Sequence, residues 1–147
     1  MLSLELDHPL RALRLRVAIG VEPGRPLALA GPSGAGKTSV LRAVAGLLRP
    51  AAGRVACGAD VWVDTARGRF VAPEDRGCAL VFQDYALFGH MSAWRNVAYG
   101  MRGVPRGERR GRAVALLERF GIGPLADARP GALSGGERQR VALARAL

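Results

Sequence analysis

The stretch GPSGAGKTS, residues 31–39, holds Lys37, the single lysine of a chain with 22 lysine and arginine residues. Residues 31–38 match the pattern G-x-x-x-x-G-K-[ST]. Glycines in such a loop let successive backbone N–H groups turn inward and form an anion nest at the positive end of the following helix. A compact ammonium on a thin stem can reach this nest, whereas the planar fork of arginine requires a different geometry. The stretch therefore predicts a phosphate-binding loop.

The segments on either side of this loop must hold it in place. PLALA (26–30) predicts a short buried strand, and TSVLRAVAGLL (38–48) predicts a helix. A glycine-rich turn without a ligand is the alternative, and the strand-loop-helix context disfavours it. The Thr38 hydroxyl is placed to bind Mg²⁺ between the β- and γ-phosphates. The residues expected to contact the nucleotide here are Gly31, Pro32, Ser33, Gly34, Ala35, Gly36, Lys37, Thr38 and Ser39.

A second candidate residue lies in ALVFQDYALF, residues 79–88. The apolar run predicts a buried strand over 78–82 with Gln83 at its tip, toward the end of the sheet that carries the phosphate loop. An amide there can bind Mg²⁺ through its oxygen and orient a water molecule through its NH₂ group. Gln83 is therefore a candidate metal ligand and catalytic residue. The alternative is a glutamine that ends a strand and is simply solvated.

The segment LSGGERQRVALARAL, residues 133–147, predicts a helix that begins with a second anion site. Ser134 is a good N-cap, Glu137 completes a capping box, and Gly135 and Gly136 expose backbone N–H groups. One triphosphate cannot easily occupy both this site and the phosphate loop unless the fold or a partner chain brings them together. A capped helix start without a ligand is the alternative.

The whole chain resembles the ATP-binding-cassette (ABC) ATPases. The resemblance rests on three motifs in that family's order and spacing: the phosphate loop at 31–38, Gln83, and LSGGE at 133–137. The resemblance implies an α/β fold: a P-loop NTPase core with N-terminal antiparallel strands and a helical subdomain, incomplete at the C-terminus. It implies ATP and Mg²⁺ as cofactors and a head-to-tail dimer of two ATPase subunits. In that dimer Ser134, Gly135, Gly136 and Glu137 would close over ATP held by the partner's phosphate loop.

Within that family, residues 68–101 look most like ATPase subunits of bacterial importers for molybdate and, less closely, for sulfate, iron or polyamines. This implies a subunit that couples ATP binding and hydrolysis to solute import. It would work with transmembrane permease subunits, as a cytoplasmic protein on the inner face of the cell membrane. Residues 85–91 and 94–99 would form the groove for the permease's coupling helix. The alternative is that Tyr85, Leu87, Phe88 and Trp94 are core residues.

The remaining pattern predicts where strands give way to helices. LSLEL and LRLRVAI alternate as strands do, and residues 54–64 add two strands around a turn at 57–60. From Asp84 onward SAWRNVAYGM and RRGRAVALLERFG have helical periodicity. We therefore expect a strand-rich nucleotide-binding core at 1–83, a helical subdomain at 84–133, and the signature motif with the start of its helix at 134–147.

Two elements of the family's pattern are missing. The chain stops at Leu147, before an apolar strand that ends in the Mg²⁺-binding Asp, the catalytic Glu and the switch histidine. The expectation is a C-terminally truncated ATPase that is inactive alone. Residues 1–61 also contain no Phe, Tyr or Trp that could stack on adenine, so His8, Arg11 and Arg14 are the candidates for that contact.

Composition narrows the function classes further. No apolar run reaches the roughly 18 residues of a membrane helix. Glu5 and Asp7 are atypical of a secretory signal, so a cytoplasmic location is expected. Cys57 and Cys78 lack the spacing of a metal site and are expected to be free, buried thiols. The formal charge of +10 comes from scattered arginines with one dense cluster at 106–112, which disfavours a nucleic-acid partner.

Two other hypotheses stay open. A DNA-repair or chromosome-maintenance ATPase of the same family would carry long coiled coils between the phosphate loop and the signature, and residues 39–132 show no sustained heptads. The other is a non-enzymatic remnant that binds nothing, which is compatible with the missing later motifs.

Overall fold

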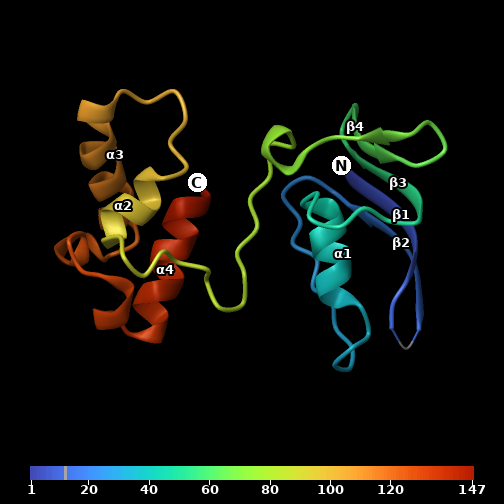
Figure 1. Ribbon diagram of the computed structural model, residues 1–147, viewed down its shortest axis with the longest axis horizontal. Coiled ribbons are helices and arrows are strands. Elements are labelled where there is room, and N and C mark those ends of the chain that lie inside the picture. The colour runs from blue at the N-terminus through green and yellow to red at the C-terminus, as the bar shows by residue number, and fades with distance from the viewer. Residues whose placement is uncertain (12) are drawn as a thin grey trace. The chain divides into compact units, whose positions relative to one another are not determined.

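The computed structural model describes residues 1–11 and 13–147. The chain divides into two compact units, Met1–Cys78 and Ala79–Leu147, each with its own hydrophobic core (Figure 1). The division falls before Gln83, whereas the sequence pattern placed the boundary just after it. Gln83 therefore belongs to the same unit as the signature segment 133–137.

The first unit is built on an antiparallel sheet with the strand order β2-β1-β3-β4-β5. Exposed and partly buried residues alternate along β2, as expected for a strand with one face on the core. The N-terminal strands and the strand pair around residues 57–60 were predicted and are confirmed. The strands are β1 (Leu2–Pro9), β2 (Arg14–Val21), β3 (Ala52–Cys57), β4 (Asp60–Asp64) and β5 (Arg69–Phe70), and the 3₁₀ turn η1 (Pro73–Asp75) follows them.

The helix α1 (Lys37–Val44) covers the apolar face of this sheet (Figure 1). The sequence predicted a helix up to residue 48, and the structure ends it earlier. Gly46 has a φ of 81°, and the N–H of Leu47 turns back to the carbonyl of Arg42 at 2.8 Å. A left-handed glycine of this kind is a common helix stop. The buried core residues are Leu4, Leu6, Val40, Ala43, Val55, Trp62 and Val63.

Arg76 is a buried cation that joins the end of α1 to the sheet, with only 2% of the residue exposed. Its Nη1 donates to the carbonyls of Ala43 and Val44, both at 2.8 Å, and its Nε donates to the carbonyl of Val71 at 2.9 Å. The guanidinium carbon lies 4.9 Å from the centre of the Phe70 ring. The last carbonyls of a helix lack partners within it and carry partial negative charge, so a cation there is favourable.

Two predicted strands are wrong. Residues 26–30 and 78–82 form no β-ladder, and Leu27 and Val81 in them are 51% and 36% exposed. Their apolar character indicated buried strands, but a strand also needs a hydrogen-bonded neighbour. Within residues 1–11 and 13–147 the sheet ends at β2 on one side and at β5 on the other. The two segments are irregular connections that lead into the phosphate-loop segment and Gln83.

The second unit is helical, with α2 (Ala93–Ala98) packed against both α3 (Arg106–Arg119) and α4 (Gly135–Ala146) (Figure 1). The 3₁₀ turns η2 (Gly123–Leu125) and η3 (Pro130–Ala132) connect α3 to α4. Leu87 and Trp94 are partly buried against this core, as the core alternative predicted for them. None of the helices in the described chain combines the length and the apolar character needed to cross a membrane. The buried core residues are Ala93, Val97, Ala98, Ala113, Leu117, Ile122, Ala126, Leu133, Val141 and Ala144.

The prediction for the cysteines is half right. Cys57 and Cys78 are free thiols, but both residues are exposed rather than buried. Cys57 is the last residue of β3, beside the tight turn into β4. Cys78 lies in one of the unpaired segments. Burial was predicted from the residue type alone, because cysteine is usually buried. Both positions are exposed instead, so the prediction of burial is wrong.

Replacing Arg76 with methionine is expected to lower the free energy of unfolding by about 2–4 kcal/mol, because the three carbonyl oxygens it binds lose their donor. The matched control is Arg69→Met on β5, an exposed position where the change should be less than about 0.5 kcal/mol. Urea denaturation followed by circular dichroism measures both. Equal stability of the two variants would contradict the assigned role of Arg76.

Candidate functional site

The segment 31–36 turns sharply at its glycines before α1 begins. Gly34 has a φ of 82° and Gly36 has a φ of 91°, which are conformations that residues with a side chain rarely adopt. At Gly36 a Cβ would also lie 3.0 Å from Leu10 Cδ1 and 3.2 Å from Leu15 Cδ1. Both the backbone conformation and the packing therefore favour glycine at this position.

Lys37 is the first residue of α1, and its side chain folds back over this segment. The Nζ donates to the carbonyls of Gly31 and Pro32, each at 2.7 Å. These bonds use two of the three N–H donors of the ammonium. They fix a positive charge at the N-terminus of α1, where the helix dipole adds partial positive charge. The arrangement is electrostatically suited to an anion.

The N-terminus of α1 also has donors to offer. Its N-cap is Gly36, and within the described residues no side chain caps the helix. The first N–H groups of a helix have no partner inside it. Thr38 lies beside Lys37 in the first turn and is exposed, so its hydroxyl is accessible from solvent. Lys37, Thr38 and the glycine turn thus lie together, and their contact with a nucleotide stays a prediction.

Gln83 is not at the tip of a strand, contrary to the prediction. It is an exposed residue in the turn 83–86, which is closed by the Tyr85 N–H donating to the Phe82 carbonyl at 2.9 Å. Lys37 and Gln83 belong to different units. The structure therefore describes their surroundings separately, and a shared role for them stays a prediction.

The signature segment forms the predicted capping box at the start of α4. The Ser134 N–H donates to Glu137 Oε2 at 2.7 Å, and the Glu137 N–H donates to Ser134 Oγ at 3.4 Å. The bond from the Ser134 backbone, followed by the bond to its side chain, lowers the pKa of the Glu137 carboxyl. The carboxylate is thereby kept ionised as part of the cap. Two donors of this helix start are thus satisfied within the chain.

Gly135 and Gly136 have no packing role in the part of the chain that the structure describes. A Cβ at Gly135 would meet nothing within 4 Å, and a Cβ at Gly136 would meet only Arg140 Nη1 at 3.9 Å. Both residues are exposed and helical. Glycine weakens a helix by about 1 kcal/mol relative to alanine. Packing within the described residues therefore does not explain either glycine, and a contact with a nucleotide stays a prediction for both.

The candidates for adenine stacking differ in their surroundings. Arg14 Nε donates to Asp7 Oδ1 at 2.5 Å, and this ion pair raises the pKa of Arg14 and lowers that of Asp7. Arg14 is therefore already engaged on the sheet. Arg11 is exposed, and His8 is partly buried on β1. The contact with adenine stays a prediction for all three.

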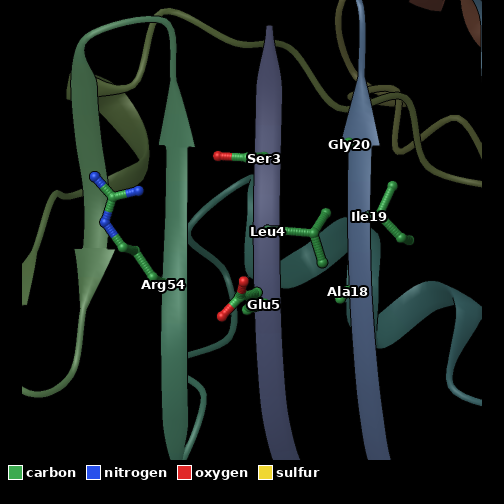
Figure 2. Close-up of a pocket in the computed structure, with 7 residues that line it drawn as sticks. All are labelled: Ser3, Leu4, Glu5, Ala18, Ile19, Gly20 and Arg54. Atoms are coloured by element: carbon green, nitrogen blue, oxygen red, sulfur yellow. The ribbon is translucent and has the colours of Figure 1, made fainter.

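A hollow of about 370 Å³ lies on the sheet, away from the predicted nucleotide contacts. Figure 2 shows it between side chains of β1, β2 and β3, where Glu5 is in register with Ala18 on one side and with Arg54 on the other. Small residues such as Ala18 and Gly20 leave the space open. None of residues 31–39 lines it, so this hollow is no part of the phosphate site.

Sequence reasoning missed Asn96, which braces the segment after Gln83. Asn96 is completely buried on α2. Its Oδ1 accepts the Phe88 N–H at 2.8 Å, and its Nδ2 donates to the carbonyls of Phe88, Met91 and Ser92 at 3.1–3.3 Å. An amide on the apolar face marked by Ala93 and Val97 was the available signal, because a buried polar group must find partners.

The chain is similar to proteins named as import ATP-binding proteins. It is 48% identical over 134 residues to the molybdate/tungstate import ATP-binding protein WtpC of Archaeoglobus fulgidus. The alignment covers 90% of this chain and 53% of WtpC. It is 46% identical over 147 residues to the molybdenum import ATP-binding protein ModC of Rhodospirillum rubrum. That alignment covers 100% of this chain and 40% of ModC. The chain therefore spans about half, or less, of the length of these relatives.

Similarity extends to an importer for a different solute and to a solved structure. The trehalose/maltose import ATP-binding protein MalK of Thermococcus litoralis is 44% identical over 133 residues, with 89% of this chain and 36% of MalK covered. The dimeric post-hydrolysis structure of the ATP-binding cassette MJ0796, bound to ADP and Pi, matches with a TM-score of 0.77 and 28% identity, covering 100% of this chain and 69% of that one. The predicted α/β fold of an ABC ATPase is thus confirmed. The family model for ABC transporters matches residues 15–147, and the chain belongs to this family.

Proposed function

We propose that this chain is the ATP-binding part of an ABC import subunit, in which residues 31–39 bind the phosphates of ATP. The observation that carries the proposal is the Lys37 ammonium, held over a glycine turn at the start of α1. The ammonium supplies a full charge, and the backbone N–H groups of the turn and of the helix start supply neutral donors. Relatives named as import ATP-binding proteins support the same role.

Thr38 and Gln83 are the residues that we assign to Mg²⁺. A hydroxyl and an amide oxygen are hard donors of the kind that Mg²⁺ accepts. Bound with ATP, the metal ion neutralises charge on the phosphates. The exposed Thr38 hydroxyl lies in the first turn of α1, next to the lysine. Gln83 keeps a second role in the proposal, because its NH₂ group can orient the attacking water.

The signature segment 134–137 is proposed to contact ATP held by a second ATPase subunit. The capping box uses the N–H groups of Ser134 and Glu137, while the exposed N–H groups of Gly135 and Gly136 stay available at the positive end of α4. A Cβ at Gly135 would meet nothing within 4 Å, so the start of α4 is open to an approaching group. The structurally similar cassette MJ0796 was solved as a dimer bound to ADP and Pi, which supports pairing with a second subunit.

The partners we propose are transmembrane permease subunits, which this chain would contact as a cytoplasmic protein on the inner face of the cell membrane. Residues 85–91 and 94–99 would receive the permease's coupling helix, and their bracing by the buried Asn96 suits a docking surface that must keep its shape. For the solute we propose molybdate or tungstate, following the names of relatives. An ATP-binding subunit does not touch the solute, so growth on limiting molybdate after deletion of the gene is the test of this part.

Lys37→Arg is expected to weaken binding of ATP·Mg²⁺ about tenfold or more, because the guanidinium fork cannot replace a compact charge beside the loop. The matched control is Arg42→Lys, the reverse exchange at an exposed position of the same helix, and its affinity should stay within about twofold of the wild type. Titration of a fluorescent ATP analogue measures all three proteins. Equal affinity of the wild type and Lys37→Arg for the ATP analogue would contradict the role assigned to the single lysine.

Gly136→Asp is expected to leave ATP binding to the monomer unchanged and to abolish ATP-driven dimerisation, since the carboxylate would repel the partner's phosphates and a Cβ would hold them away. Gly107→Asp is the matched control, because Gly107 is exposed in the first turn of α3 and a Cβ there meets nothing within 4 Å. Light scattering after size exclusion, on the protein as its gene encodes it, with a non-hydrolysable ATP analogue, separates the variants. Normal dimerisation of Gly136→Asp would rule out the role in trans.

A further inference from the structure

We infer that Arg145, near the end of α4, is a positioning residue that clamps the turn after Gln83 to the helix that begins with the signature motif. The functional part of this inference rests on the proposed roles of Gln83 and of the signature. The clamp itself rests only on contacts inside the second unit. Arg145 would make the Gln83 turn and α4 respond together when either of them meets a nucleotide.

The contacts form a planar fork. Arg145 Nη2 donates to the carbonyl of Tyr85 at 2.9 Å, and Nη1 donates to the carbonyl of Ala86 at 2.8 Å. The guanidinium carbon lies 5.6 Å from the centre of the Phe88 ring, within the range of a cation–π contact. One side chain of α4 therefore touches the segment directly after Gln83 at three points. These partners precede Arg145 by 57–60 positions in the chain, so the contact is a tertiary one.

The backbone that receives this fork is strained. Tyr85 has a φ of 63° and Ala86 has a φ of 44°. Within the described residues these are the only residues other than glycine with a positive φ. Residues with a Cβ avoid this region, and such strain persists only where the surroundings hold it. The left-handed pair turns two successive carbonyls toward one side chain, and the bonds from Arg145 offset the strain.

The helix that carries Arg145 is firmly packed. Val141 and Ala144 on α4 are buried in the core of the second unit, together with residues of α2. Arg145 itself is partly buried, and this burial lowers its pKa. On the other side of the turn, the buried Asn96 fixes Phe88 and the following residues to α2. The segment 85–92 is therefore held from α4 and from α2.

Arginine is required for this geometry. A guanidinium presents two parallel N–H donors in one plane, whereas an ammonium is a point charge without that fork. Arg145→Lys therefore preserves the positive charge and much of the stem but removes the paired bonds. Ala86→Gly changes the other side of the contact, because glycine adopts a positive φ without strain. If Arg145 acts by holding the turn, glycine at position 86 should make the arginine less necessary.

The first test is hydrogen–deuterium exchange of the nucleotide-free protein, read in peptides that cover residues 83–88. Arg145→Lys should raise exchange there about tenfold, with peptides of α3 unchanged. The control is Arg119→Lys, an exposed arginine at the end of α3, which should leave both regions unchanged. Unchanged exchange at 83–88, or a loss of protection throughout the second unit, would overturn the inference.

The second test is ATP hydrolysis by the protein as its gene encodes it. Arg145→Lys should lower kcat by about tenfold to a hundredfold with KM for ATP within about twofold, since the turn rather than the phosphate loop is displaced. Adding Ala86→Gly should restore most of kcat, and a failure of this rescue would contradict the positioning role. If Lys37→Arg binds ATP·Mg²⁺ as tightly as the wild type, the proposed function fails, while the exchange experiment still decides whether the clamp exists.

Discussion

A helix start leaves N–H groups without partners inside the helix, and the chain meets this constraint differently at its two candidate sites. At α4, Ser134 and Glu137 exchange two hydrogen bonds and satisfy part of the start internally. At α1, the N-cap is a glycine and no side chain of the described residues takes over that task. The α1 start therefore keeps the larger number of available donors, and it is the one that carries a full positive charge beside it. The two helix starts therefore differ chemically. This difference agrees with the proposal that the start of α1 binds the phosphates and the start of α4 contacts ATP of a second subunit.

Basic side chains resolve the opposite problem, that of carbonyls without partners. Arg76 collects the last carbonyls of α1 together with that of Val71, and Arg145 collects two carbonyls of a strained turn. In both cases a guanidinium binds several acceptors whose directions differ. Lys37 also binds two carbonyls, but they belong to an exposed loop and its third donor remains. Arginine thus binds carbonyls where they need several donors in one plane, and the lysine keeps one donor beside an exposed loop.

Much of this arrangement could be predicted from the sequence, because its signals are local. The glycine-lysine pattern indicates the position of the loop, and Ser134 with Glu137 indicates the capping box, which the structure contains. Arg145 could not be recognised in the same way, since its partners lie 59 and 60 positions earlier in the chain and residue types do not reveal which carbonyls need a donor. Asn96 has local partners, and its amide on an apolar helix face was a signal that went unused. The turn at Tyr85 and Ala86 was equally hidden, because neither residue type favours a positive φ.

The two wrong strands have a common cause. The apolar runs at 26–30 and 78–82 indicated burial, and from burial we predicted strands of a sheet. A strand, however, is defined by its hydrogen-bonded neighbour, which periodicity cannot supply. Within the described chain the antiparallel sheet carries neither Lys37 nor Gln83 nor the signature. Lys37 and Gln83 follow irregular segments, and the signature follows the 3₁₀ turn η3. The residues proposed to act on ATP are therefore oriented by helix ends and by single side chains that donate to backbone carbonyls. One substitution at Arg145 is then expected to move the turn after Gln83 without unfolding the core of the second unit.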